Sequence, residues 1–256
     1  MKPQISVIMG VRNQAAYLPT AISSILNQSF SNLEFIIIND ASTNTTAAVL
    51  NRFKDKRIKL FTNSTHQGLA RSLNRGIRHS RGDYIARMDA DDIAYPQRLE
   101  TQLNYLIKHP GVAACGTAAN LINTHGQKIG IKRFPARITP SLLMRFNPLI
   151  HPTVMIRKKF VTYDPGLNGA EDYDLWLRLC SQYQLANINK ILLAYRVNPE
   201  GISWNDLKHT ELQAIKARFK ALMQYNYPLW QAIFIIKPVL SYFIPSWVKK
   251  LLFNIS

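Results

Sequence analysis

The feature that most constrains the fold is the alternation of strand-like and helix-like segments in the first third of the chain. Four apolar runs rich in β-formers predict strands at residues 5–9, 33–38, 58–61 and 84–88. The run at 33–38 is nearly continuous, which is typical of a strand covered on both faces. Helical spacing of apolar residues fills the intervals at 15–28, 45–53 and 68–79. This order predicts an α/β fold whose mostly parallel, doubly wound, Rossmann-like sheet is flanked by helices.

The middle of the chain is less regular. Helices are expected at 96–108 and 171–182, and strands at 112–117 and 191–197. Residues 123–127 resemble a hairpin turn, and the four prolines within 131–160 predict mixed short elements. A long, basic, amphipathic helix is expected at 204–225.

The last 30 residues change in character. Residues 227–256 hold seven aromatic residues and three lysines but no acid. Prolines interrupt the apolar runs, so none reaches the roughly 20 residues that span a bilayer. Aromatic residues interleaved with lysines favour a segment that lies on an anionic membrane surface. The alternative is a pair of helices packed on the domain or against a second subunit.

Composition limits the classes of protein. The 256 residues suffice for one large domain, or for a domain with an appendage, and the net charge of +17 attracts polyanions. Cys115 and Cys180 stand singly, which argues against a disulfide framework or a thiolate metal site. The N-terminus lacks a basic segment followed by an apolar one, so we expect no secretory signal and a cytoplasmic protein.

The scarce acids are concentrated in two short windows. The chain has only 15 acids, and three of them, Asp89, Asp91 and Asp92, directly follow the fourth predicted strand. Ligands of doubly wound sheets bind at the carboxyl ends of strands. Closely spaced carboxylates suit Mn²⁺ or Mg²⁺ and leave coordination sites for phosphate oxygens. The alternative is that these acids cap the helix expected after Pro96.

The second window is Glu171, Asp172 and Asp174. A carboxylate here can act as a general base toward a hydroxyl, although acids at the start of a helix are also favoured by its dipole. Asp40 ends the second strand, where it can bind a base or ribose or cap the next helix. Gly68 opens a helix whose N–H groups can meet a phosphate or ribose. No GxGxxG, P-loop, HExxH or GxSxG motif is present.

Taken together, residues 4–205 resemble the family 2 glycosyltransferases, which are inverting enzymes of the GT-A fold. Each matching motif is short, but their order and spacing are specific. The motifs lie at residues 5–13 (ISVIMGVRN), 21–30 (AISSILNQSF), 34–42 (EFIIINDAS), 68–77 (GLARSLNRGI), 82–92 (GDYIARMDADD), 151–155 (HPTVM), 171–176 (EDYDLW) and 195–197 (YRV).

The resemblance implies roles for individual residues. Asp40 would hydrogen-bond the nucleobase, typically uracil, and Asp89 would lie near the ribose. The nucleotide-sugar pocket would comprise Gly10, Val11, Asn13, Asp40, Gly68, Asn74, Asp89 and Ala90. Asp91, with Asp89 and His151, would meet the metal on the diphosphate, although a lone His before a Pro is more often structural. Asp172 would deprotonate the acceptor, and Glu171 would orient acceptor or base.

Two departures from the family pattern stand out. Arg12 replaces the usual aromatic residue after the first strand, and no His follows Tyr195-Arg196. The Gln-x-x-Arg-Trp motif of processive synthases is absent, which favours transfer of a single sugar.

We therefore expect an inverting hexosyl- or N-acetylhexosaminyl-transferase that uses a nucleotide-sugar, typically a UDP-sugar, and a glycan or lipid-linked acceptor in surface polysaccharide synthesis. The catalytic domain would span 1–205, with a nucleotide half at 1–95 and an acceptor half at 96–205. Residues 206–256 would attach the protein to the inner face of the cell membrane or join subunits. A nucleotidyltransferase is one alternative, and a non-catalytic membrane- or nucleic-acid-binding protein is another. We expect no nucleic-acid partner.

Overall fold

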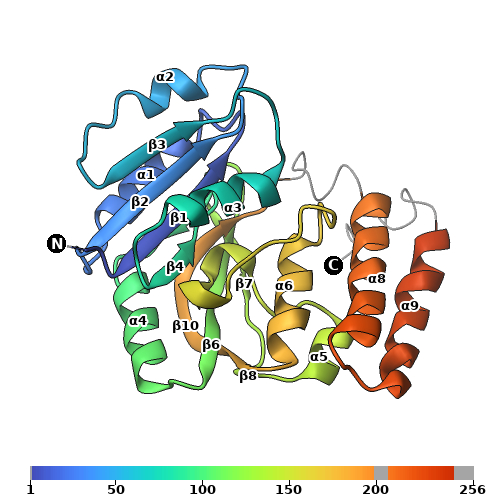
Figure 1. Cartoon of the computed structure of the whole chain (residues 1–256). Coiled ribbons are helices and arrows are strands. Elements are labelled where there is room, and N and C mark those ends of the chain that lie inside the picture. Colours follow the sequence, from blue (N-terminus) through green and yellow to red (C-terminus); the bar gives the residue numbers. More distant parts are fainter. Residues whose placement is uncertain (1, 199–206, 245–256) are drawn as a thin grey trace.

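The computed structural model describes residues 2–198 and 207–244 (Figure 1). Strand–helix alternation in its first third is as expected. The elements there are β1 (Ile5–Val11), α1 (Leu18–Leu26), β2 (Leu33–Asn39), α2 (Thr46–Leu50), β3 (Ile58–Thr62), α3 (Leu69–His79) and β4 (Tyr84–Arg87).

Short elements fill residues 137–160, as the prolines within 131–160 predicted, between the longer elements of the middle of the chain. The elements are β5 (Ile93–Ala94), α4 (Arg98–Lys108), β6 (Val112–Ile122), β7 (Lys128–Lys132), β8 (Arg137–Ile138), α5 (Pro140–Arg145), β9 (Met155–Arg157), α6 (Glu171–Cys180) and β10 (Gln184–Arg196). Single 3₁₀ turns, η1 (His151–Thr153) and η2 (Lys158–Phe160), flank β9. The expected hairpin turn at 123–127 joins β6 to antiparallel β7.

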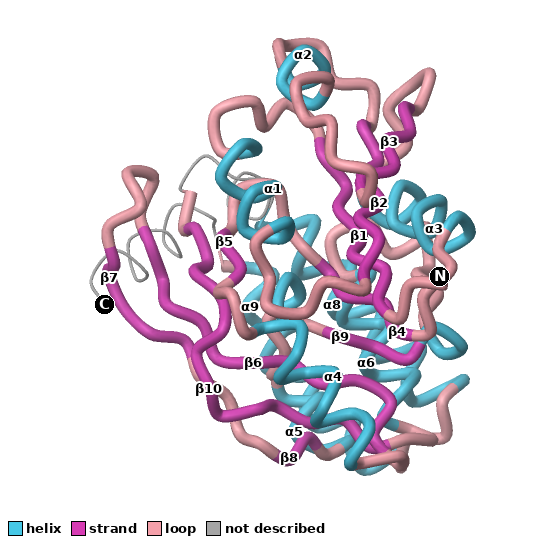
Figure 2. Tube along the Cα trace, turned by 90° about the vertical axis from the view of Figure 1, so that its left-hand side faces the viewer, coloured by secondary structure: helices cyan, strands magenta, loops and turns pink. Residues whose placement is uncertain are grey.

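The strands form one twisted sheet in the order β3-β2-β1-β4-β9-β6-β10-β5, with β7 added to β6 and β8 to β10 (Figures 1 and 2). The first four strands are mutually parallel, which confirms the predicted doubly wound half. β9 is antiparallel to both β4 and β6 and joins the two parts of the sheet. β6 and β10 are parallel to each other.

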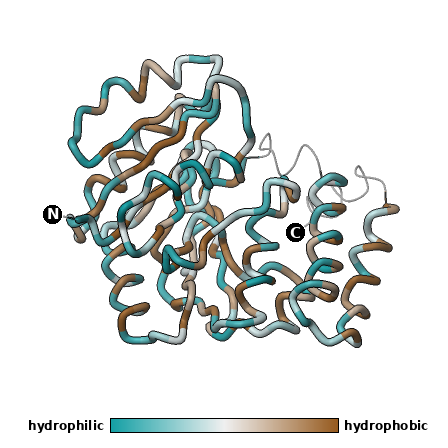
Figure 3. The backbone as a smooth tube through the Cα atoms, viewed as in Figure 1, coloured by the Kyte–Doolittle hydropathy of each residue, from teal (hydrophilic) through white to brown (hydrophobic). Residues whose placement is uncertain are grey.

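Two apolar layers cover the sheet, and β1 contributes to both. Ile5, Val7 and Met9 pack toward α1 and α4, while Ile8 packs toward α3 and α6. Figure 3 shows hydrophobic segments along β1 and β2, and also on helices such as α4 and the last helix that the structure describes. On the α3 side, a Cβ added at Gly76 would lie 2.6 Å from Cγ2 of Ile8, so this glycine lets the helix approach the sheet closely.

The C-terminal helices pack against the domain. α8 (Leu207–Gln224) lies beside α6, and α9 (Ile233–Phe243) follows the 3₁₀ turn η3 (Leu229–Ala232) and lies beside α8 (Figure 1). Tyr225 donates a hydrogen bond to the buried Asp174 of α6 at 2.8 Å, and Tyr227 donates one to the Leu177 carbonyl at 3.0 Å.

The start of the basic, aromatic tail is thus part of the folded body. Residues 204–206 of the expected long helix and the end of the tail, 245–256, lie outside the described residues. Within the described ranges, no helix is both long and apolar enough to cross a bilayer.

Candidate functional site

The parallel strands β1, β2 and β4 end at one edge of the sheet, and the predicted acids follow them. Asp40, just after β2, is buried and accepts four hydrogen bonds. The donors are the Asn63 side-chain amide at 2.7 Å, the Gln67 and Gly68 backbone N–H groups at 2.8 and 2.9 Å, and a ring nitrogen of His66 at 2.7 Å. Burial opposes ionisation of Asp40, but these hydrogen bonds together lower its pKa below the usual value.

Asp40 therefore organises the loop that opens α3, whichever group it later binds. Gly68 sits at the N-cap of that helix with φ of +86°, a conformation that glycine adopts without strain. Gly10, near the end of β1, faces the same helix, because a Cβ added there would lie 3.1 Å from Cδ1 of Leu69. The loops after β1 and β2 and the start of α3 thus converge.

The loops after β1 and β2 are also joined to each other. The Asn13 side-chain oxygen accepts a hydrogen bond from the Thr43 N–H at 2.9 Å, and the Asn13 N–H donates to Oγ of Ser42 at 3.1 Å. Val11 is buried beneath these loops. The predicted residues Gly10, Val11, Asn13, Asp40 and Gly68 lie in this one region of the fold.

Asn74 of α3 is held by two hydrogen bonds to the backbone of Tyr163. Its side-chain nitrogen donates to the Tyr163 carbonyl at 2.8 Å, and its oxygen accepts from the Tyr163 N–H at 2.9 Å. Both ends of the amide thus tie α3 to the segment that leads into α6. This contact positions the second acid window against the first half of the sheet.

The acids after β4 occupy three different environments. Asp89 accepts a hydrogen bond from the Arg87 guanidinium at 2.5 Å. Asp92 is buried, with one oxygen accepting from the Arg196 N–H at 2.8 Å and the other without a partner among the described residues. Asp91 is half-buried, and burial followed by the nearby Asp89 charge raises its pKa to about 6. Ala90 is buried between them.

Arg196, from the Tyr-Arg motif, locks the backbone around this window. Its Nε donates to the Asp91 carbonyl at 2.8 Å, and one terminal nitrogen donates to the carbonyls of Asn123 and Thr124 at 2.8 and 3.0 Å. The guanidinium lies 4.3 Å from the ring centroid of Tyr17. The acidic loop is thereby fastened to the β6–β7 turn.

The second acid window opens α6, and its members point in different directions. Glu171 is buried and accepts from the Gly169 N–H at 2.7 Å, while Asp172 accepts from the Asn147 side-chain amide at 2.9 Å. Burial, followed by the Asp172 charge, raises the Glu171 pKa to about 7. Burial also raises the pKa of Asp172. Asp174 instead accepts a hydrogen bond from Tyr225, just after α8, and is structural.

His151 packs against aromatic residues in this geometry. Its Nε2 lies 2.8 Å from the Tyr163 hydroxyl, and its ring meets Trp176 edge-on with centroids 6.1 Å apart. Burial, followed by the Arg87 charge, lowers its pKa well below the usual value, so the ring is neutral. Among the described residues, no three side chains of His, Cys, Asp or Glu form a ready metal cluster. The binding of a metal by Asp91, Asp89 and His151 stays a prediction.

Sequence reasoning missed Arg87, which occupies the centre of the site. Its guanidinium is buried and donates to the Met88 carbonyl and to Asp89, while its Nε has no partner among the described residues. The Arg87 charge lowers the pKa of carboxylates in both windows, on Asp91, Asp92, Glu171 and Asp172. One buried cation, in contact with Asp89, therefore acts on the carboxylates of both acid windows. The available signal was a charged residue inside the apolar run at 84–88.

Comparison with known proteins agrees with this geometry. The model of "Glycosyl transferase family 2" matches residues 6–161. The "Putative glycosyltransferase EpsE" of Bacillus subtilis is 33% identical over 258 residues, covering 97% of this chain and 92% of the relative. The "UDP-Glc:alpha-D-GlcNAc-diphosphoundecaprenol beta-1,3-glucosyltransferase WfgD" of Escherichia coli is 29% identical and covers 82% of this chain and 83% of the relative.

Solved structures share the fold. S. aureus TarS 1-349, in complex with UDP-GlcNAc, matches 92% of this chain and 71% of its own with a TM-score of 0.73 and 14% identity. The mannosyltransferase PcManGT of Pyrobaculum calidifontis, in complex with GDP-Man and Mn²⁺, matches 99% of this chain and 80% of its own with a TM-score of 0.66 and 16% identity. The GT-A fold is thus confirmed, and the nucleotidyltransferase and non-catalytic alternatives find no support. The chain belongs to glycosyl transferase family 2 and is a glycosyltransferase.

Proposed function

We propose that the protein transfers a single sugar from a UDP-sugar to an acceptor hydroxyl with inversion at the anomeric carbon. The observation that carries this proposal is the position of Arg87 between the two acid windows. The Arg87 charge lowers the pKa of Asp91 and of Asp172 against the larger effect of burial, which supports placing the donor-side and acceptor-side carboxylates near each other. That is the arrangement a transfer between two bound substrates requires.

A divalent cation fits the donor side. Mn²⁺ and Mg²⁺ are commonly held by one or two carboxylates together with substrate phosphate oxygens, so a three-residue protein cluster is not needed. Asp91 and Asp89 supply two such carboxylates, and the Asp89 charge raises the pKa of Asp91, a repulsion that a cation would relieve. When bound, the cation would neutralise charge that develops on the departing diphosphate.

Asp172 is the proposed base. Its carboxylate is oriented by the Asn147 amide and by the Tyr173 N–H at 2.7 Å. Its raised pKa makes the ionised form a stronger proton acceptor than an exposed Asp. The acceptor oxygen attacks the anomeric carbon and loses its proton to Asp172. The bond from that carbon to the UDP oxygen breaks on the opposite face, which inverts the configuration.

The donor and acceptor classes are inferred from the relatives. TarS was solved with UDP-GlcNAc, and the name of WfgD specifies UDP-Glc and a diphosphoundecaprenol-linked acceptor. We propose a UDP-hexose or UDP-N-acetylhexosamine and a lipid-linked glycan of surface polysaccharide synthesis. The catalytic domain would comprise residues 1–205, with its nucleotide half at 1–95 and its acceptor half at 96–205.

The test is a screen of nucleotide sugars with Mn²⁺, followed by thermal shift and by release of the nucleoside diphosphate. A UDP-sugar should raise the melting temperature, and the Asp172→Asn variant should bind UDP normally while transfer falls by about a thousandfold. The matched control is Asp83→Asn, an exposed acid paired with Lys2. If no nucleotide sugar stabilised the protein, the proposal would fail. Equal loss of UDP binding and transfer in Asp172→Asn would make Asp172 a structural residue.

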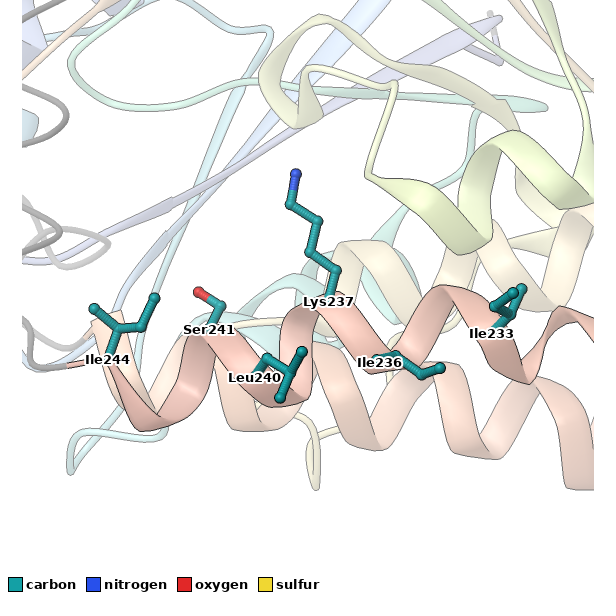
Figure 4. Close-up of a pocket in the computed structure, with 6 residues that line it drawn as sticks. All are labelled: Ile233, Ile236, Lys237, Leu240, Ser241 and Ile244. Carbon is teal, nitrogen blue, oxygen red and sulfur yellow. The ribbon is translucent and has the colours of Figure 1, made fainter.

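We also propose that the outer face of η3 and α9 holds the protein on the inner face of the cell membrane. Six large apolar side chains there are between 55% and 75% exposed: Leu229, Trp230, Ile233, Ile236, Leu240 and Phe243. They repeat at helical spacing, while Ile235 on the opposite side is buried against the domain. Figure 4 shows Ile236 and Leu240 standing out from α9 beside Lys237, along a shallow cavity of about 470 Å³.

Charge favours an anionic bilayer as the occupant of this face. α9 contains no acid, and the chain carries a net charge of +17. Vesicles with anionic lipid should pellet the protein, and the Ile236→Gln/Leu240→Gln variant should lose most of this binding. The control is Ile129→Gln/Ile131→Gln, which removes two exposed apolar side chains from β7. A wild-type dimer in solution that those two α9 substitutions dissociate would identify a second copy as the occupant instead.

A further inference from the structure

Helix α3 carries an unusual charge pattern on its outer side. Arg71, Arg75 and Arg78 are spaced at i, i+4 and i+7, so they share one face of the helix, and the helix contains no acid. The opposite face, with Leu73 and Gly76, is buried against the sheet. Like charges at these spacings repel one another, and a bound anion would reduce this repulsion.

The three arginines line a cavity of about 420 Å³. No carboxylate belongs to its lining, which is completed by Asn63, Ser64, Gln67, Asn74 and Pro165. The cavity therefore offers guanidinium and amide donors with no internal counter-charge. Among the described residues, neither Arg71 nor Arg78 has a hydrogen bond or ion pair.

Hydrogen bonds fix the positions of several residues that line the pocket. Arg75 donates to the Thr62 carbonyl at 2.8 Å and to the Asn63 side-chain oxygen at 2.5 Å, and it lies over the Phe61 ring. Asn63 is itself buried. The wall formed by Pro165 is positioned by the paired hydrogen bonds between Asn74 and the Tyr163 backbone.

The pocket shares a wall with the donor side without being part of it. The Asn63 amide accepts from Arg75 with its oxygen and donates to Asp40 with its nitrogen, at 2.7 Å. The arginines thus lie on the far side of this amide from Asp40. They also lie on the other side of α3 from Gly10, which packs against Leu69.

We propose that this pocket on the outer face of α3 binds a phosphate or diphosphate group at a place separate from the nucleotide-sugar site. Guanidinium forks match phosphate oxygens geometrically, and side-chain amides supply further donors. A cavity of about 420 Å³ has room for a diphosphate group. The group has two possible sources, a free phosphate compound or the diphosphate of a lipid-linked acceptor, and the second rests on the proposed function.

Inorganic pyrophosphate is the probe. It is titrated calorimetrically into the full chain in EDTA, with UDP present in excess, so that neither a metal nor the donor site accounts for binding. The Arg71→Gln/Arg78→Gln variant should weaken pyrophosphate binding by at least about tenfold. The matched control is Arg52→Gln/Arg137→Gln, which removes the same charge from exposed positions elsewhere and should bind as wild type.

Kinetics then distinguish the sources. If the pocket holds the acceptor's diphosphate, the Arg71→Gln/Arg78→Gln variant raises KM for a lipid-diphosphate acceptor about tenfold and leaves KM for a phosphate-free acceptor glycoside unchanged. If it holds a free phosphate compound, both KM values stay unchanged while pyrophosphate binding is lost. Absence of pyrophosphate binding, or equal binding by wild type and by this variant, overturns the proposal. Because calorimetry measures pyrophosphate binding without any sugar transfer, its outcome does not depend on whether the proposed function is correct.

Discussion

Replacing Glu171 with Gln should stabilise the folded protein at alkaline pH. The ordinary Glu pKa of 4.5 rises to about 7 at this position because the carboxyl is buried and faces Asp172. Each pH unit between the unfolded and folded pKa values corresponds to about 1.4 kcal/mol. The ionised side chain therefore costs the folded state about 3 kcal/mol at pH 8. Gln has nearly the same shape, stays neutral, and keeps an oxygen to accept the Gly169 N–H.

The effect of Glu171 on folding stability changes with pH in a defined direction. Because the folded pKa lies above the unfolded one, the folded state binds the proton more tightly, and stability falls as pH rises from about 4.5 to about 7. The Gln variant lacks this titration. Its advantage over wild type should be about 3 kcal/mol at pH 8, fall to about 1 kcal/mol near pH 5.5, and vanish below pH 4.5.

Urea unfolding followed by fluorescence measures this directly, since Trp176 is fully buried in the same helix. The control is Glu100→Gln on α4, where the side chain is exposed and the change should stay within about 0.5 kcal/mol at either pH. A destabilising effect of ionised Glu171 would be ruled out if the Glu171→Gln variant had no higher free energy of unfolding than wild type at pH 8. It would also be ruled out if the difference between the two did not shrink as the pH is lowered. If the Glu171→Gln variant were more stable but transferred no sugar, the ionised Glu171 would be a residue that destabilises the fold and is needed for catalysis.

Three other substitutions test the framework around the site. Gly76→Ala should lower the free energy of unfolding by about 1–3 kcal/mol in urea titration, because the new Cβ would lie 2.6 Å from Cγ2 of Ile8. Lys220→Met removes the cation 3.1 Å from the buried carboxylate of Asp174 and should cost about 2 kcal/mol, which Asp174→Asn in the same background should largely restore. Arg196→Met should weaken UDP–Mn²⁺ binding more than it lowers the melting temperature, because its guanidinium fastens the acidic loop to the β6–β7 turn.

Local patterns explain why the parallel half of the fold was predictable. β1 and β2 are long, apolar and separated by an amphipathic helix, so their type and order follow from periodicity alone. β5 and β8 have two residues each and β9 has three, which is too short for any period to appear. Their strand character comes from partners far along the chain, such as the pairing of β9 with both β4 and β6.

The residues of the site likewise differ in whether a local sequence pattern or only tertiary contacts reveal them. Asp91 and Asp172 were predicted because acids cluster along the chain in a protein that has few of them. Arg87 was missed because its meaning lies in tertiary contacts with both windows. The hydrogen bonds that occupy Asp40 and Asn74 were likewise hidden, since their partners are 23 to 89 residues away.

The contacts of the acidic loop also rank its three carboxylates. Asp89 is already neutralised in part by Arg87. Asp92 is buried, and burial followed by the charges of Asp89 and Asp91 raises its pKa well above the usual value. Asp91 is half-exposed, and its side-chain carboxylate has no hydrogen-bond donor from another described residue, while its backbone carbonyl is held by Arg196. Under the proposed function, a cation that binds with a diphosphate would gain most from Asp91, because this carboxylate is half-exposed and has no ion pair among the described residues.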